Sequence, residues 1–143
     1  MMVSTRGRYA LRMMIDLAEN SHDNEYIAMK DIAERLEISK KYMEQIMPVL
    51  VKNGLVEGMQ GQGGGYRLTR RPEDYRVGEI LRLTEGDLAP VACLSESAHP
   101  CSRAADCRTL PMWKKFYRIT LEYFDGITLK ELMRQNSQND YVI

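Results

Sequence analysis

The apolar positions of the N-terminal segment repeat every three to four residues, as they do on one face of an amphipathic helix. This segment begins at a residue suited to helix capping, Ser4 or Thr5, and ends in the polar loop 20–24. The pattern therefore predicts a first helix, and its buried face comprises Ala10, Met13, Met14, Leu17 and Ala18.

Two more helices are predicted in close succession, over 29–36 and 40–52, because both spans keep the helical spacing of apolar residues. Only a short turn separates them, and Ser39 stands where the N-cap of the later helix is expected. Pro48 falls inside that helix, where its ring opposes the preceding turn. We therefore expect a kink or break near Met47.

The pattern then changes to one typical of a β-hairpin. Strands are predicted over 55–59 and 66–69, and the glycine-rich turn 61–65 joins them. Two helices, a sharp turn, a third helix and a hairpin, in this order, are the elements of a winged helix-turn-helix domain. The predicted fold class is mainly α, with a small β-hairpin wing, and residues 1–86 are expected to form this domain.

The second half of the chain has a different organisation. After a short helix predicted from Val77 to Leu83, residues 87–109 show little periodicity and contain all three cysteines, so we expect a long loop. A strongly helical pattern covers 110–125, and Thr128 caps a last short helix. The polar tail 135–140 is expected to be frayed.

Composition excludes several classes of protein. Hydrophobic content of 44% and charged content of 28% are ordinary for a folded globular chain. No apolar run approaches the roughly 18 residues that cross a bilayer, and the N-terminus lacks the apolar core of a signal peptide. We therefore expect a cytoplasmic protein without membrane contact. No nucleophile with an adjacent base and no phosphate-binding loop suggests an enzyme.

The charges along the chain are separated, although 20 basic and 20 acidic side chains give a net charge of zero. Residues 1–12 carry +3, residues 13–37 carry −5 and residues 39–71 carry +4. The last block covers the third helix and the hairpin, which are the parts of a winged helix that face DNA. Its position favours double-stranded DNA as the partner, although a winged helix used only for protein contacts remains an alternative.

The start of the third helix has the side chains that read a major groove. Lysines neutralise phosphates, Gln pairs with adenine, Glu accepts from cytosine, and hydroxyl groups bond phosphate. The candidate residues here are Ser39, Lys40, Lys41, Tyr42, Glu44 and Gln45.

The hairpin offers a second set of DNA-contacting candidates, in which glycines permit close approach and arginines supply charge. These are Gly63, Gly64, Gly65, Arg67, Arg70 and Arg71. Arg8 and Arg12 lie one turn apart on the first helix, and the pattern leaves open whether they contact phosphate or only cover the helix surface.

Several short motifs lie in order along the chain: Ser4-Thr5-Arg6-Gly7-Arg8-Tyr9-Ala10, Ile32-Ala33-Glu34-Arg35, Ile38-Ser39-x-x-Tyr42-Met43-Glu44-Gln45, Asn53-Gly54-Leu55-Val56, Gly61-x-Gly63-Gly64-Gly65-Tyr66-x-Leu68, Val77-Gly78-Glu79-Ile80, Trp113 and Ile127-Thr128-Leu129-x-Glu131-Leu132. In these motifs the chain resembles the IscR, NsrR and CymR group of bacterial winged-helix regulators over nearly its whole length. The resemblance implies a homodimer built on a long C-terminal helix, palindromic operator DNA, and transcriptional control, as a repressor, of iron–sulfur, nitrosative-stress or sulfur metabolism.

The long helix of this family corresponds to 110–125 here, so residues 110–143 are assigned to a dimerisation helix followed by a helix and tail, with 87–109 as the cysteine loop. Five of the chain's eleven aromatic residues fall within this helix. An aromatic stripe by itself is also typical of an intramolecular core. With the resemblance, we expect a dimer interface made by Trp113, Phe116, Tyr117, Thr120, Tyr123 and Phe124.

Cys93, Cys101 and Cys107 share one loop, and cluster-binding relatives have three cysteines in this same place. The resemblance thus implies an iron–sulfur cluster, 2Fe-2S or 4Fe-4S, as a sensor of iron, redox or nitrosative state. Two departures leave the fourth ligand undetermined: Leu110 replaces the family histidine, and Arg8 replaces an acidic residue of the first helix.

The remaining candidates for a fourth ligand are His99 and, behind it, Glu96 and Asp106. The gap between Cys93 and Cys101 is also longer than the family's usual five residues. Zinc bound by three cysteines and His99, a thiol redox switch, and a cluster-free regulator of the CymR kind that responds to a protein or small molecule remain alternatives.

Overall fold

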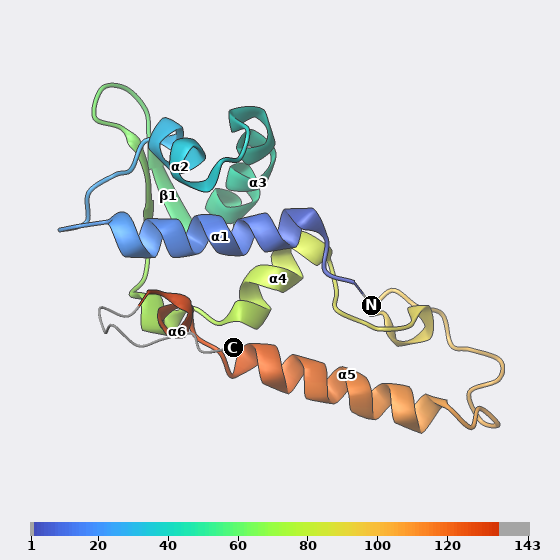
Figure 1. Ribbon diagram of the computed structural model, residues 1–143. Helices are drawn as coiled ribbons and strands as arrows, with labels where there is room; N and C mark the ends of the chain where they lie inside the picture. Colours follow the sequence, from blue (N-terminus) through green and yellow to red (C-terminus); the bar gives the residue numbers. More distant parts are fainter. Residues whose placement is uncertain (1, 135–143) are drawn as a thin grey trace.

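The structure is a computed structural model that describes residues 2–134 (Figure 1). The predicted frayed tail lies outside these residues. The elements are α1 (Thr5–Asn20), α2 (Met29–Leu36), α3 (Lys40–Lys52), β1 (Val56–Met59), β2 (Gly65–Leu68), η1 (Pro72–Asp74), α4 (Val77–Glu85), η2 (Ala92–Leu94), α5 (Leu110–Asp125) and α6 (Leu129–Leu132). The mainly helical winged helix-turn-helix fold is confirmed, and its two strands form one antiparallel hairpin.

Helix α1 is central to the fold. Helices α2 and α3 and the hairpin lie on one side of it, whereas α4 and α5 lie on the other (Figure 1). Its predicted apolar face is buried, and Met13, Met14 and Leu17 are fully enclosed in the main core. Ser4 caps the helix as expected, because its Oγ accepts a hydrogen bond from the amide of Gly7.

The helix-turn-helix is closed by a turn that needs no glycine. Glu37 adopts a left-handed conformation with φ 54° directly after α2, and Ile38 is buried beyond it. Ser39 then caps α3 by accepting from the amide of Tyr42 at 3.1 Å. This short turn sets the recognition helix α3 against α1 and α2.

The predicted break at Pro48 does not occur, because α3 is one helix from Lys40 to Lys52. Residues on both sides of the proline, including Met43, Met47 and Leu50, are fully buried and hold the helix in place. Pro48 itself is exposed, so the backbone carbonyl that loses its helical donor lies on the side where water is available.

The wing is tied to the rest of the domain by a third segment of chain. Ile27 and Tyr66 exchange two backbone hydrogen bonds of 2.8 Å, which adds an isolated bridge to the hairpin. Gly65 lies against this bridge with φ 150°, and a Cβ there would stand 2.2 Å from the carbonyl oxygen of Ile27. The close approach of these two backbones therefore requires glycine at position 65.

The C-terminal segment returns to the N-terminal domain. The amide of Val77 donates to the carbonyl of Ile127 at 2.9 Å, and the amide of Leu129 donates to the carbonyl of Tyr75 at 3.1 Å. Both Leu129 and Tyr75 are fully buried. The described part of segment 110–143 is thus packed on the winged helix at its far end, through α6.

Helix α5 makes limited contact with the rest of the chain and contains no buried residue. One of its faces packs on Val77, Leu81 and Leu88, and Arg82 of α4 forms two hydrogen bonds of 2.7 and 2.8 Å with Asp125 near its end. The hydrogen bonds from Arg82 lower the pKa of Asp125. None of the helices described in residues 2–134 combines the length and apolar character of a membrane span.

Candidate DNA-binding surface and cysteine segment

The N-terminal part of α3 presents its predicted reading residues to solvent. Lys40, Lys41, Glu44 and Gln45 are exposed, while the opposite face of the helix is buried in the core. An exposed helix face with two cations at its start has the shape and charge to enter a major groove. Ser39 is also exposed, but its hydroxyl oxygen already accepts the capping bond.

Tyr42 contributes to the position of α3. It is half-buried, and its ring meets that of Tyr9 edge-to-face at 5.3 Å. Arg12 lies over the Tyr9 ring at 5.4 Å and donates from Nη2 to the carbonyl of Leu36 at 2.9 Å. These contacts anchor α1 to both α3 and the last residue of α2.

Arg6 is a second contact between α1 and the recognition helix. Its Nη2 donates to the backbone carbonyl of Gln45 at 3.2 Å, and the side chain is exposed. On this helix the sequence pattern indicated Arg8 and Arg12 as candidate phosphate contacts, and Arg6 was not among the candidates. The Arg8 side chain donates to the Thr5 hydroxyl one turn away, at 3.1 Å.

Two of the three wing arginines predicted to contact DNA, Arg67 and Arg70, are paired with acidic side chains of the protein itself. Arg67 pairs with Glu57, its cross-strand partner, donates to the carbonyl of Asn24 at 2.9 Å, and lies over the Tyr26 ring at 4.3 Å. Arg70 forms two hydrogen bonds with Glu79, at 2.9 and 3.0 Å. The pKa of each arginine is raised, and the main cause is its hydrogen bond to the acidic partner.

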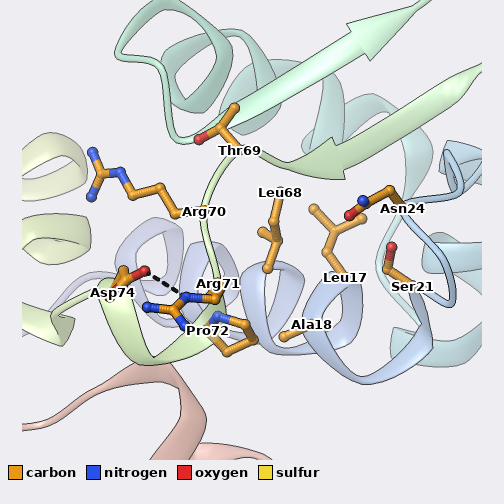
Figure 2. Close-up of a pocket in the computed structure, with 10 residues that line it drawn as sticks. All are labelled: Leu17, Ala18, Ser21, Asn24, Leu68, Thr69, Arg70, Arg71, Pro72 and Asp74. Atoms are coloured by element: carbon orange, nitrogen blue, oxygen red, sulfur yellow. Dashed lines mark hydrogen bonds and ion pairs between the residues drawn. The ribbon is translucent and has the colours of Figure 1, made fainter.

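Arg70 and Arg71 lie at the base of the wing, where Figure 2 shows their side chains pointing in different directions. A pocket of about 530 Å³ beside them is bounded by the end of α1, the start of η1 and the loop at Asn24. Arg71 approaches Asp74 at its edge, at 3.3 Å. Both cations therefore have acidic partners and lie away from the wing tip.

The tip of the wing is uncharged and exposed. Met59, Gln60 and Gln62 are its side chains, and the amide of Gly64 donates to the carbonyl of Gly61 to close the turn. A Cβ on Gly64 would lie 2.2 Å from the carbonyl oxygen of Met59, so the turn itself requires this glycine. The sequence pattern indicated charge at the wing; Gln60 and Gln62, which flank the glycine that begins the turn, were not among its candidate residues.

The cysteine segment 87–109 contains little regular structure beyond η2, which agrees with the predicted long loop. Cys93 and Cys101 are exposed, Cys107 is half-buried, and all three are free thiols. Within residues 2–134, no group of three or more His, Cys, Asp or Glu side chains is placed to hold a metal ion. The three thiols are chemically suited to a cluster, but this arrangement does not bring them together.

Cys107 has a distinct environment at the start of α5. Its Sγ lies 3.5 Å from the hydroxyl oxygen of Thr109. That hydrogen bond, supported by the amides of Thr109 and Leu110, lowers the pKa of the Cys107 thiol. A thiolate beside a helix N-terminus is the more reactive form of cysteine. His99, the first candidate for a fourth ligand, is exposed.

The predicted aromatic stripe of α5 is divided between two faces. Tyr117 and Phe124 pack toward α4, while Thr120 bonds to the carbonyl of Phe116 at 2.9 Å. Trp113 is half-buried and meets Phe116 edge-to-face at 6.4 Å. The outward face holds large exposed apolar side chains with heptad spacing, among them two that sequence reasoning omitted: Met112, Phe116, Ile119 and Tyr123.

Comparison with known proteins agrees with the fold. A family model described as "Rrf2: Iron-dependent Transcriptional regulator" matches residues 3–135. Protein rrf2 of Nitratidesulfovibrio vulgaris is 36% identical over 137 residues, which cover 96% of this chain and 90% of that protein.

Two solved structures of regulators are similar to this one. CymR, the global cysteine regulator of B. subtilis, has a TM-score of 0.73 and 33% identity, covering 92% of this chain and 95% of that chain. IscR of T. potens has a TM-score of 0.72 and 33% identity, covering 99% of this chain and 95% of that chain.

Proposed function

Because this chain belongs to the Rrf2 family of transcriptional regulators, which are DNA-binding proteins and not enzymes, we propose that it binds palindromic operators as a homodimer and represses transcription. The observation that carries this proposal is the exposed, basic start of α3, with Lys40, Lys41, Glu44 and Gln45 on one accessible face. The proposed setting is the cytoplasm, where operator DNA is accessible.

The outward face of α5 is the observation that supports the proposed homodimer. Phe116, Ile119 and Tyr123 are 44%, 51% and 65% exposed, which is unusual for large apolar side chains on one helix stripe. A second copy of the same face buries this stripe in a two-fold interface, and two-fold symmetry matches a palindromic site. Trp113 extends the interface at its edge, while Tyr117 and Phe124 act within the protomer.

The DNA contacts divide by chemistry. Lys40 and Lys41 are proposed to bind phosphates, and Glu44 and Gln45 to read base edges in the major groove. At the wing, Gly63 to Gly65 shape the turn. Gln60 and Gln62 are its exposed hydrogen-bonding side chains. Arg67 and Arg70 instead stabilise the wing by forming ion pairs with Glu57 and Glu79.

The operator is expected to be an inverted repeat. The purified protein is used to enrich duplexes from a random-sequence pool, and the enriched duplexes are sequenced. Two identical half-sites separated by about one helical turn, roughly 10 base pairs, or a multiple of it, are the expected result. Enrichment of a single unrepeated site contradicts the dimer, and no enrichment above background favours a winged helix that contacts only proteins.

An iron–sulfur cluster held by Cys93, Cys101 and Cys107 is the proposed signal-sensing group. The cysteines suit it because they are free thiols in one segment that regular structure does not constrain. Within residues 2–134 the three thiols are not placed together, and the proposed DNA contacts use side chains of α3 and the wing alone.

A cluster-free regulator is the second candidate, and the separation of the three thiols favours it. The lowered pKa of Cys107 favours thiol chemistry as its signal, since a thiolate is the form that oxidants attack. The relative CymR is described as a global cysteine regulator. The same separation within residues 2–134 counts against the zinc site of three cysteines and His99.

Anaerobic reconstitution distinguishes the two candidates. The protein is incubated with ferrous iron and sulfide without oxygen, desalted, and analysed for iron, acid-labile sulfide and visible absorption. A coloured protein with iron and sulfide in equal amounts is expected, and Cys101→Ser should lose both because one thiolate ligand is removed. Ser97→Ala, in the same segment, is the matched control. A colourless wild type without iron supports the cluster-free regulator.

A further inference from the structure

The carboxylate of Glu85, the last residue of α4, lies at the beginning of α1. The Ser4 amide donates to its Oε1 at 2.9 Å, and the Ser4 hydroxyl donates to the same oxygen at 2.7 Å. The hydroxyl oxygen of Ser4 also accepts from the amide of Gly7 at 3.1 Å. One serine therefore caps α1 and binds Glu85 at the same time, which we call the Glu85–Ser4 contact.

Gly7 makes room for this carboxylate. Gly7 is buried inside α1, and a Cβ at this position would lie only 2.2 Å from Oε1 of Glu85. Gly7 is the third residue of α1, and glycine has a low helix propensity, so its presence in this first turn needs a steric reason. The Glu85 carboxylate provides that reason, and an acidic group is favourable at this end of a helix.

Helix α1 is hydrogen-bonded to both α3 and α2, so its position affects theirs. Arg6 lies two residues after the contact, and its Nη2 donates to the backbone carbonyl of Gln45 in α3. Arg12, two turns further along, donates to the carbonyl of Leu36 at the end of α2. A displacement of the start of α1 therefore moves the side chain that bonds the middle of the recognition helix.

Glu85 also stands directly before the cysteine segment. Gly86 ends α4 with φ 83°, and Asp87 begins segment 87–109. Asp87 accepts from the amide of Ala89 and from the hydroxyl of Ser95, so the first turn of the segment is fixed on the residue two positions after Glu85. A rearrangement of the segment thus acts on the backbone next to the Glu85–Ser4 contact.

We propose that the Glu85–Ser4 contact is the link through which the arrangement of segment 87–109 sets the position of the recognition helix. Glu85 is then a positioning residue for sequence-specific DNA binding, acting through Ser4, α1 and Arg6 without touching DNA. This inference rests on the proposed function, because it needs a protein that reads DNA sequence with α3.

The first experiment compares two duplexes, the one enriched from the random pool and one of random sequence. Glu85→Ala is expected to lower affinity for the enriched duplex by about tenfold, the size of one base contact. Affinity for the random duplex, and its salt dependence, should stay unchanged because the lysines still meet phosphates. Glu85→Gln should retain most specific affinity, since its amide oxygen accepts the same two hydrogen bonds. Glu122→Ala, on exposed α5, is the control.

Two further variants keep the test independent of one substitution. Gly7→Ala displaces the carboxylate without altering either partner, and should reproduce the loss seen in Glu85→Ala. Arg6→Ala added to Glu85→Ala should cost less than it does in the wild type, because both act along one path. Alkylating the thiols with iodoacetamide should change specific affinity in the wild type and have a smaller effect in Glu85→Ala.

The inference is overturned if Glu85→Ala and Gly7→Ala bind the enriched duplex as the wild type does. It is equally overturned if affinity for both duplexes falls together, which indicates general loss of structure, or if alkylation has the same effect with and without Glu85. Failure of the wild type to bind any duplex is a separate result, and it contradicts the proposed function.

Discussion

Replacing Ile119 with glutamate is expected to convert the protein into a monomer and to lower its affinity for the enriched palindrome at least about 100-fold. Ile119 is 51% exposed at the centre of the outward stripe of α5, between Phe116 and Tyr123. A two-fold interface would bury two of the introduced carboxylates without partners, and an unpaired buried charge costs several kcal/mol. A loss of about 3 kcal/mol corresponds to a factor of about 100.

Sedimentation equilibrium and DNA titration measure the two effects. Lys114→Glu introduces the same charge on the same helix at an exposed position off the stripe, and it should remain dimeric. The dimer proposal is contradicted if Ile119→Glu sediments like the wild type. Because Tyr117 and Phe124 are already packed against α4, Phe124→Glu is expected to act differently, by loosening α5 from its own protomer.

Replacing Arg35 with alanine is expected to cost about 2–3 kcal/mol of unfolding free energy, the largest loss predicted for a residue outside the apolar core. Asp16 is only 5% exposed, and Arg35 donates to both of its carboxylate oxygens, at 2.9 and 2.8 Å. Breaking a buried ion pair costs roughly 3–5 kcal/mol. The expected loss is smaller because Arg35 is 39% exposed and Asn20 still donates to Asp16.

Urea unfolding at one fixed protein concentration measures this loss, since the stability of the proposed dimer would depend on concentration. Arg71→Ala is the matched control. Arg71 is 76% exposed, so its pairs with Glu73 and Asp74 should contribute less than about 0.5 kcal/mol. A loss for Arg35→Ala no larger than that of Arg71→Ala contradicts the structural role given to the Asp16–Arg35 pair.

The helices were predictable because their signals are local. The apolar spacing and the caps at Ser39 and Thr128 define α3 and α6 within the neighbouring few residues. The break expected at Pro48 is absent for a related reason: the local cost of the proline is real, but tertiary burial of Met47 and Leu50 keeps α3 one helix. Local sequence signals indicate the secondary structure that a segment prefers, and tertiary packing determines the one that it adopts.

The contacts that place the site are long-range, and most of them left no local signal. The bridge between Ile27 and Tyr66 and the bond from Arg6 to Gln45 join residues about 40 positions apart. One such contact did have a readable signal, because Glu57 and Arg67 face each other across a hairpin whose turn was predicted. That register already indicates that Arg67 is paired within the wing.

The two faces of α5 likewise depend on long-range packing that the sequence pattern did not show. The sequence predicts one stripe of five aromatic residues and Thr120, which the family resemblance assigns to a dimer interface. The structure instead sorts them by angle around the helix, with Tyr117 toward α4 and Phe116 outward. A heptad reading that included Met112 and Ile119 would have separated the faces from sequence.

The salt dependence of binding to the enriched duplex tests the central claim, that the basic start of α3 holds the phosphates of operator DNA. Log affinity should fall linearly with log salt, and Lys40→Ala or Lys41→Ala should lower affinity and flatten the slope by about 2, since a homodimer loses two phosphate contacts per substitution. Lys114→Ala should leave the slope unchanged. A slope that stays at the wild-type value in both α3 variants contradicts the claim.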